Sequence, residues 1–161
     1  MLITLFFVSN LSDSTVTFIT DIMIEAKYNK KEVINMIRFG IVGAGGIAQK
    51  FVRDIQFCEG AIATAIASRN IEKANKFKDE HNIEFAFGSY EEMAKSDLID
   101  AVYIATPHNF HMEQSILFMK HKKHVLCEKP IAVNVEQFEK MVASAKENKV
   151  LLMEAMWTRF L

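Results

Sequence analysis

An acidic and a basic residue stand together at the end of an apolar run in the segment HVLCEKP, His124 to Pro130. The first four residues of this segment are typical of a buried strand, and the proline ends it. Glu128 and Lys129 are therefore expected where a strand leaves the core. A partly desolvated lysine can exchange protons near neutral pH, whereas a solvated pair at a strand end would have no chemical role.

A glycine-rich turn lies earlier in the chain, in the segment IRFGIVGAGGIAQKF. Its residues 43–48 fit the pattern G-x-G-x-x-G/A, which joins a strand to a helix and holds a pyrophosphate at the helix N-terminus. Gly43 would permit the tight turn, Gly45 would let the backbone approach the phosphates, and Ala48 would let the helix pack close to the strand. A plain glycine turn is the alternative, but the strand-like and helix-like flanks favour a binding turn.

The segment AIASRN ends with Ser68 and Arg69, where an NAD-preferring site usually carries an acidic residue for the ribose hydroxyls. An arginine at this position can pair with a 2′-phosphate, which favours NADP over NAD. The alternative is a solvated arginine at the start of a helix.

The chain has two prolines, and both follow runs of strand-like composition, in ATPHNFH and CEKP. Open parallel sheets bind ligands at the carboxyl ends of their strands, so Pro107 and Pro130 predict two rigid turns at a ligand edge. Simple strand termination explains Pro107 equally well. His108 and His111 fall in the first of these turns, where a histidine often serves only as a hydrogen-bonding surface group.

A metal site is not expected. His121, His124 and Cys127 are spaced by three, but they straddle a helix end and a strand, where this spacing does not place side chains on one face.

The net charge is −1, with acidic and basic residues interleaved, which provides no charged surface for nucleic acid or for an anionic membrane. No apolar run is long enough to span a bilayer, and MLITLFFV lacks the basic region and the cleavage site of a signal peptide. Cys58 and Cys127 form no Cys-x-x-Cys pair and are expected to be buried thiols in a reducing compartment. We therefore expect a cytoplasmic protein.

From Met36 onward, short β-rich runs alternate with segments of helical period. Two of these segments place their apolar residues on one helix face. These residues are Ile47, Phe51 and Ile55 in the first segment and Val135, Phe138, Met141, Val142 and Ala145 in the last. The alternation predicts parallel strands with right-handed crossovers, and therefore an α/β fold with a doubly wound six-stranded sheet in the order 3-2-1-4-5-6. The expected strands are Ile37–Val42, Ala61–Ala67, Glu84–Phe87, Ala101–Ala105, His124–Cys127 and Val150–Met153.

Together these motifs resemble the N-terminal dinucleotide-binding domain of the Gfo/Idh/MocA family (glucose–fructose oxidoreductase, inositol dehydrogenase and MocA). The resemblance spans nearly all of residues 36–161, in the family's order and spacing. It is most similar to the branch of dihydrodiol dehydrogenase and NADP-dependent xylose dehydrogenase. The matching segments are IRFGIVGAGGIAQKF, AIASRNIEKA, AVYIATPHNFHMEQ, HVLCEKP and LLMEAMWTRFL.

The resemblance implies a role for each matched residue. Lys129 would be the catalytic residue and touch the substrate, and its bond to Pro130 is often cis in the family. The residues implied to bind the cofactor are Gly43, Gly45, Gly46 and Ile47 at the pyrophosphate, Ser68 and Arg69 at the adenosine ribose or its phosphate, Thr106, Pro107, Asn109 and His111 along the cofactor path, Glu128 and Lys129 at the nicotinamide, and Trp157 and Arg159 closing over it.

Three features depart from the family. Lys122 stands where many members have glycine, so we expect it to be mildly strained in a left-handed helix cap. Residues 1–35 have no counterpart in the family. The family's second α/β domain, which supplies the sugar pocket and an Asp/His pair that acts with the lysine, has no counterpart in this sequence. We therefore expect substrate recognition to depend on residues outside it.

We expect the chain to consist of a dinucleotide-binding domain, residues 36–161, preceded by an extension, residues 1–35, that is poorly ordered or not natively translated. Lys31-Glu32-Val33 can be encoded AAG-GAG-GTN, which is a bacterial ribosome-binding sequence, a few codons before Met36. Translation is therefore expected to start at Met36.

The resemblance implies an NADP-preferring oxidoreductase, with NAD as the other possible cofactor. It would transfer a hydride between the nicotinamide and a sugar, a polyol or a related alcohol. The chain alone is expected to have little activity and to act on a substrate only with the second domain, and full-length relatives are expected to be homo-oligomers. Two alternatives are a dinucleotide-binding module without chemistry and an inactive remnant whose exposed apolar surface would cause aggregation.

Overall fold

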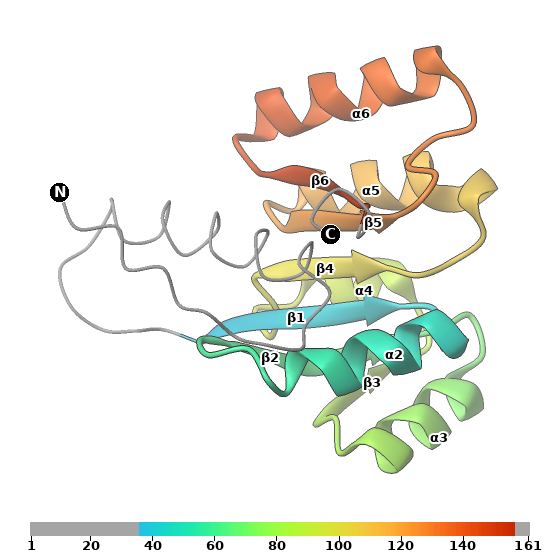
Figure 1. Ribbon diagram of the computed structural model, residues 1–161, viewed down its shortest axis with the longest axis vertical. Helices are drawn as coiled ribbons and strands as arrows, with labels where there is room; N and C mark the ends of the chain where they lie inside the picture. Colours follow the sequence, from blue (N-terminus) through green and yellow to red (C-terminus); the bar gives the residue numbers. More distant parts are fainter. Residues whose placement is uncertain (1–35, 157–161) are drawn as a thin grey trace, which may run out of the picture.

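Short apolar runs form six parallel strands in one sheet, which a computed structural model describes over residues 36–156 (Figure 1). Their spatial order is β3-β2-β1-β4-β5-β6, and every neighbouring pair is parallel. This confirms the doubly wound sheet and the strand order predicted from the sequence. The strands are β1 (Ile37–Val42), β2 (Ala61–Ala67), β3 (Phe85–Phe87), β4 (Ala101–Ile104), β5 (His124–Glu128) and β6 (Leu152–Ala155).

Each crossover contains a helix, and three of the helices begin at a polar residue that caps their first turn. Asn70, Ser89 and Asn134 each accept a hydrogen bond from the backbone N–H three residues later. The helices are α2 (Gly46–Ile55), α3 (Ile71–His81), α4 (Tyr90–Lys95), the 3-10 turn η1 (His108–Phe110), α5 (His111–Lys120) and α6 (Val135–Asn148).

Successive side chains along each strand point to opposite faces of the sheet, so the buried side chains form two cores, one on each face. On one face, Phe51 of α2 stacks on Tyr103 of β4, with 4.0 Å between ring centroids, and meets the edge of Phe39 of β1. On the other face, Phe118 of α5 and Met141 of α6 pack against the side chains of β4 and β5. Both faces of the central strands are therefore buried, as expected of a parallel sheet.

The amino ends of the strands are joined by hydrogen bonds from the side chains of Arg38 and Lys123. Arg38 donates to both carboxylate oxygens of Asp100, at 2.7 and 3.0 Å, and to the carbonyl oxygen of Asp97. Lys123 donates to the carbonyl oxygens of Ser96 and Ile99. These contacts tie β1, β4 and the start of β5 together at the edge opposite the glycine-rich turn.

Four of the expected strands have different bounds in the structure. The third begins one residue later, the fourth ends one residue earlier, and the fifth and sixth extend further at their carboxyl ends. The last strand begins at Leu152, not Val150, because α6 ends in a left-handed cap at Lys149 and the N–H of Val150 donates back to the carbonyl of Ala145. The fifth strand continues to Glu128. Glu128 and Glu154 consequently lie within paired strands.

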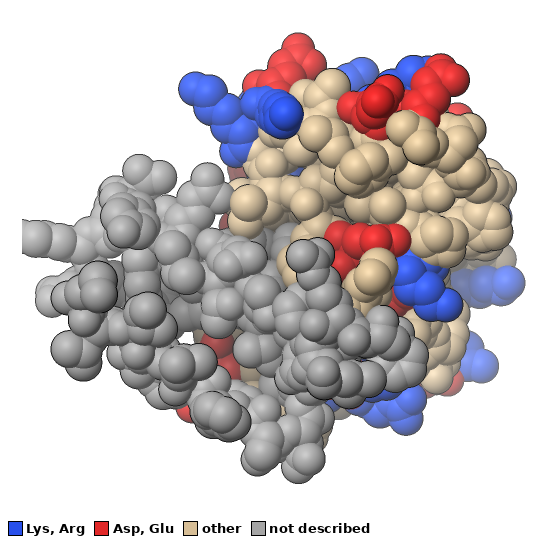
Figure 2. All heavy atoms as spheres, turned by 45° about the horizontal axis from the view of Figure 1, so that its top comes forward, with Lys and Arg blue, Asp and Glu red and all other residues tan. Residues whose placement is uncertain are grey.

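The predicted apolar helix faces are only partly buried. Phe51 and Ile55 are buried, but Ile47 in the first turn of α2 is 44% exposed. On α6, Met141 is buried, whereas Val135 is 72% exposed. Figure 2 shows an uncharged stretch of surface on the part of the molecule that carries α6, with charged side chains around it. Phe138 is also exposed on α6.

The expectation for Lys122 is confirmed, because its φ is 62° and it lies just beyond the C-terminus of α5. Its ammonium group donates to the side chain of Asn148 at 3.0 Å. Within residues 36–156, no helix is long and apolar enough to cross a membrane. Over the same residues, no group of three His, Cys, Asp or Glu side chains is arranged to hold a metal ion.

Replacing Asp100 by Asn tests the contacts at the amino ends of the strands. Burial alone would raise the pKa of Asp100, but the hydrogen bonds from the side chain and backbone of Arg38 and the Arg38 charge outweigh it and lower the pKa. A carboxylate whose pKa is lower in the folded chain stabilises it above the unfolded-state pKa, and this stabilisation is lost as pH falls through the folded-state pKa. We expect Asp100→Asn to reduce the free energy of unfolding by about 1 kcal/mol near neutral pH, since the pair is partly exposed and screened.

Urea denaturation across a series from neutral to acidic pH measures this effect. The variant should lose less stability on acidification than the parent chain. Glu59→Gln, which removes an exposed carboxylate elsewhere, is the control. An acid dependence in Asp100→Asn equal to that of the parent would contradict the assignment.

Candidate functional site

The glycine-rich turn brings the end of β1 against the end of β4. Gly43 has a φ of +97°, and a Cβ atom there would lie 3.1 Å from both the carbonyl oxygen of Ala105 and the Cγ2 atom of Thr106. Its N–H donates to the carbonyl of Ala67 at the end of β2. Glycine is required here for both its backbone conformation and its lack of a side chain.

The next two glycines leave open space beside the start of α2. A Cβ atom on Gly45 or Gly46 would meet no heavy atom within 4 Å. Gly45 is the N-cap of α2, no side chain accepts a hydrogen bond from the first turn, and no acidic residue lies there. The first N–H groups of α2 are therefore available to an anion, and the helix dipole favours negative charge at this end. This arrangement fits a pyrophosphate group.

The end of β2 lies on the other side of this turn. Ser68 accepts a hydrogen bond from the N–H of Asn70 at 3.3 Å. The exposed Arg69 places its guanidinium carbon 5.3 Å from the ring centroid of Phe110, which belongs to the 3-10 turn after β4. This cation–π contact spans the space between the ends of β2 and β4. It holds a positive charge at the same edge of the sheet as the glycine-rich turn.

The turn after β4 presents exposed residues at the same edge of the sheet. Pro107, His108 and Asn109 are exposed, whereas Thr106 is half-buried and donates its hydroxyl hydrogen to the side chain of Gln114 at 2.5 Å. Thr106 thus fixes the turn to α5. The exposed residues of the turn are the ones that a ligand can reach.

The structure differs from the expectation for His111, which was to line the cofactor path. Its side chain is only 1% exposed. Nδ1 lies 2.9 Å from the carbonyl oxygen of Pro130, and Nε2 lies 2.8 Å from the carbonyl oxygen of Thr106. His111 therefore lies behind the surface of the edge and joins the turn after β4 to the turn after β5.

Glu128 is half-buried at the strand end, and both of its carboxylate oxygens have partners. One accepts a hydrogen bond from the hydroxyl of Tyr103 on the neighbouring strand, and the other accepts from the N–H of Lys129 at 3.1 Å. Burial raises the pKa of Tyr103, and so do the charge of Glu128 and the hydrogen bond between Tyr103 and Glu128. The hydroxyl consequently remains protonated and donates to Glu128.

Lys129 begins the turn after β5, and its peptide bond to Pro130 is cis, as the resemblance implied. Its side chain is exposed, not partly buried as the sequence suggested. Since the backbone is held through Glu128 and Pro130, the ammonium group extends from a fixed point at the sheet edge.

Two residues of this edge were not assigned from the sequence. Tyr103 is the single hydroxyl-bearing residue in the otherwise apolar strand β4. This difference from its neighbours could have indicated a polar contact in the sequence. Glu154, in the motif EAMWTRF, accepts a hydrogen bond from the N–H of Ile131 at 2.8 Å. Trp157 and Arg159, which were expected to close over the cofactor, lie outside the described residues.

The two cysteines have no features of a reactive nucleophile. Cys127 is buried, as expected, but Cys58 is only half-buried. Burial raises the pKa of Cys58 to about 11 and that of Cys127 to about 12. Both thiols are therefore protonated at neutral pH.

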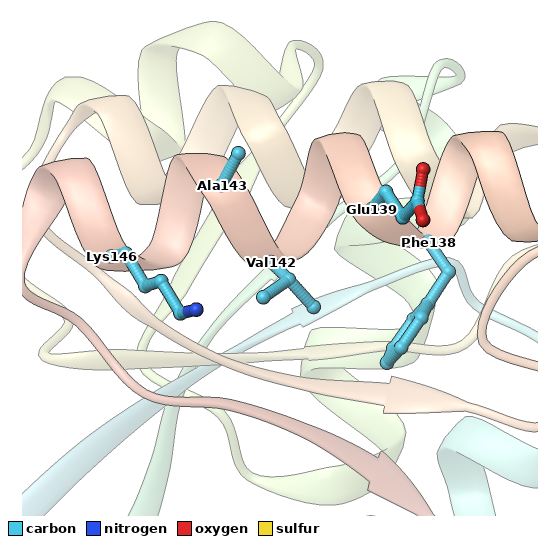
Figure 3. A pocket seen from close by; sticks show the side chains of 5 residues that line it. All are labelled: Phe138, Glu139, Val142, Ala143 and Lys146. Atoms are coloured by element: carbon cyan, nitrogen blue, oxygen red, sulfur yellow. The ribbon is translucent and has the colours of Figure 1, made fainter.

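A shallow hollow elsewhere on the surface is lined by residues of α6 alone, which are Phe138, Glu139, Val142, Ala143 and Lys146 (Figure 3). It contains no residue from the strand ends. It is therefore separate from the site at the carboxyl edge of the sheet.

Comparisons with known proteins agree with this arrangement. The family described as "Oxidoreductase family, NAD-binding Rossmann fold" matches residues 37–156. The chain belongs to the Gfo/Idh/MocA family of oxidoreductases. Its relatives include an inositol dehydrogenase and dihydrodiol dehydrogenases, which confirms the resemblance found in the sequence.

Among curated relatives, a scyllo-inositol 2-dehydrogenase (NADP(+)) of Bacillus subtilis is 50% identical over 126 residues, which cover 78% of this chain and 38% of the relative. A trans-1,2-dihydrobenzene-1,2-diol dehydrogenase of Danio rerio is 42% identical over 126 residues, or 77% of this chain and 38% of the relative. The chain therefore spans less than two fifths of the length of these relatives.

Solved structures give the same result for the fold. A 3-ketoreductase from Actinomadura kijaniata, in complex with NADP and TDP-benzene, matches with a TM-score of 0.71 and 34% identity over 75% of this chain and 37% of its own. The apo scyllo-inositol dehydrogenase of Lactobacillus casei matches with a TM-score of 0.74 and 26% identity, over 81% and 39% of the two chains.

Two substitutions in the glycine-rich turn should have opposite consequences. Gly43→Ala should reduce the free energy of unfolding by at least about 1 kcal/mol, because of its positive φ and its contact with Ala105 and Thr106. Gly45→Val should leave stability nearly unchanged, because its Cβ meets open space. The valine side chain should nevertheless weaken NADPH binding about tenfold or more by filling the place of the phosphates.

Thermal denaturation and fluorescence titration with NADPH measure the two effects separately. Ala143→Val on the exposed surface of α6 is the control for an added valine side chain. Undiminished NADPH affinity in Gly45→Val would contradict the assignment of this turn to the phosphates.

Proposed function

We propose that the chain binds NADP(H) along the carboxyl edge of its sheet and serves an oxidoreductase that acts on a sugar, a polyol or a related alcohol. NAD would be the less favoured cofactor. In this proposal the substrate pocket is supplied by a second domain, as the resemblance implies.

The observation that carries the proposal is that three strand ends with different chemistry meet at one edge. The open, uncapped start of α2 follows β1, the guanidinium of Arg69 follows β2, and Lys129 follows β5. A dinucleotide has a pyrophosphate, an adenosine end and a nicotinamide end. It could contact all three strand ends at once.

Each residue would have a separate task in this proposal. The backbone at Gly43, Gly45, Gly46 and Ile47 would hold the pyrophosphate, and Ser68 and Arg69 would hold the adenosine ribose with its 2′-phosphate. Thr106, Pro107 and Asn109 would form the wall of the path, with His111 behind it. Trp157 and Arg159 would close over the cofactor, as the resemblance implies.

Lys129 would lie at the nicotinamide end, beside Glu128. The nicotinamide, when bound, supplies the position that accepts or donates the hydride. Lys129 would receive or return the hydroxyl proton of the substrate, which must move when an alcohol is oxidised or a ketone reduced. Its exposed ammonium group on a fixed backbone supports this role.

The preference for NADP is supported by Arg69 and by the relatives. The name of the Bacillus subtilis enzyme specifies NADP(+), and the 3-ketoreductase structure contains NADP. A guanidinium group matches the geometry of a phosphate and forms strong charge-assisted hydrogen bonds with it. The contact with Phe110 holds Arg69 near the place where the 2′-phosphate would lie.

Arg69→Ala tests the cofactor preference. We expect it to weaken NADPH binding about tenfold to a hundredfold and to change NADH binding less than about twofold, because only NADPH carries the 2′-phosphate. Fluorescence titration of the purified chain with each nucleotide measures this. Lys120→Ala, an exposed cation at the C-terminus of α5, is the control. Equal losses for NADPH and NADH would contradict recognition of the 2′-phosphate.

Lys129→Met separates an enzyme site from a dinucleotide-binding module without chemistry. Loss of the ammonium group should weaken NADPH binding about threefold to tenfold, but should leave binding of 2′,5′-ADP unchanged, because that ligand lacks the nicotinamide half. Lys129→Arg, which keeps the charge, should recover part of the loss. NADPH affinity that is unaffected by Lys129→Met would favour the module.

A further inference from the structure

One peptide group near Lys129 has a side-chain partner at both its carbonyl oxygen and its N–H. This group joins Pro130 to Ile131. Its carbonyl oxygen lies 2.9 Å from Nδ1 of His111, and its N–H donates to a carboxylate oxygen of Glu154 at 2.8 Å. The two side chains come from α5 and β6, which are distant in sequence.

The surroundings of His111 make this contact a rigid one. Its ring is buried, and its second nitrogen lies 2.8 Å from the carbonyl oxygen of Thr106. The ring is thus fixed between two turns, and Thr106 is itself held to α5 through Gln114. Movement of the Pro130 carbonyl would have to break the contact with His111 or displace a buried side chain.

The chemistry of the two contacts is complementary. A peptide group is a dipole whose oxygen is negative and whose N–H is positive. The imidazole meets the negative end and the carboxylate meets the positive end. In the tautomer that carries its proton on Nδ1, the imidazole donates to the carbonyl oxygen of Pro130. Hydrogen bonds at both ends of the peptide then polarise it in the same direction, so each strengthens the other. The acceptor at Glu154 is in addition a charged group, which strengthens its bond to the N–H of Ile131.

The same turn is also held on its other side. Glu128 accepts from Tyr103 with one oxygen and from the N–H of Lys129 with the other. The peptides before and after Lys129 and Pro130 are therefore fixed, while the Lys129 side chain itself is exposed. The direction in which the ammonium group leaves the sheet depends on this backbone.

We propose that His111 and Glu154 act together, through the peptide group between Pro130 and Ile131, as positioning residues for Lys129. Their contacts set the place of Lys129 at the nicotinamide half of the cofactor. Neither side chain needs to touch the cofactor to do so. This inference rests on the proposed function, because it takes Lys129 to meet that half.

Binding of two nucleotides to variants of the full chain tests the proposal. Glu154→Ala should weaken NADPH binding about fivefold to tenfold and leave 2′,5′-ADP binding within twofold, because only the nicotinamide half meets the disturbed turn. Glu154→Gln, which keeps an acceptor for the N–H of Ile131, should recover most of the affinity. Glu147→Ala, which removes an exposed carboxylate on α6, is the matched control.

His111 is tested in the same way. His111→Leu should give the same loss for NADPH alone, and His111→Asn, which retains a donor near the position of Nδ1, should recover part of it. The double variant Glu154→Ala with His111→Leu should bind NADPH no more than about twofold worse than the weaker-binding single variant. Two residues that act through one peptide are not additive.

A second measurement does not depend on nucleotide binding. In the parent chain, the amide proton of Ile131 should show a downfield chemical shift because it donates to a carboxylate. It should move upfield in Glu154→Ala. It should also move upfield in His111→Asn and His111→Leu, although His111 contacts only the carbonyl end of the peptide.

These outcomes distinguish a failure of the proposed function from a failure of the positioning role. If the parent chain binds neither NADPH nor 2′,5′-ADP, the proposed function fails, and the Ile131 amide alone decides whether the peptide is coupled to His111. If the parent binds both but the variants weaken both equally, or weaken neither, the positioning role is overturned. An Ile131 amide that is unmoved by both His111 variants also overturns it.

Discussion

The hydrogen bonds that pair β1 with β2 on one side and with β4 on the other determine where the candidate residues lie. All of these strands run in the same direction, so their carboxyl ends meet at one edge. The chain leaves β1 through Gly43, leaves β2 through Ser68 and leaves β4 through Ala105. A crevice forms at such an edge where neighbouring crossovers turn to opposite faces of the sheet. Residues that are far apart in sequence become neighbours only because the strands are in register.

Much of the fold could be predicted from the sequence because its determinants are local. Runs such as Ile37–Val42 and Ala61–Ala67 are short, apolar and followed by turn residues, which indicates buried parallel strands. The order of the strands then followed from the handedness of crossovers. The error at the start of the last strand arose at a helix end. Val150 and Leu151 look like strand residues, but Val150 completes the C-terminal cap of α6, and the N–H of Leu151 donates to His124.

The candidate site was predictable in its outline but not in its internal contacts. The glycines, Arg69 and Lys129 could be identified because each follows a strand in a motif of fixed spacing. Burial of His111 and the partners of Glu128 and Glu154 could not, since they join residues that no short pattern relates. The segment LLMEAMWTRFL, which matches the family, contains Glu154, but the resemblance implied no role for this residue. Side-chain contacts to backbone groups of another turn become evident only in three dimensions.

The amino ends and the carboxyl ends of the strands have different roles. At the amino edge, Arg38 and Lys123 connect side chains to backbone carbonyls and hold the strands together. At the carboxyl edge, open space beside Gly45 and the exposed side chains of Arg69 and Lys129 face outward. The outward-facing residues at the carboxyl edge contribute little to folding. Such a division leaves the carboxyl edge free to change during evolution, so that one scaffold can alter its ligand preference while its stability is maintained from the opposite side.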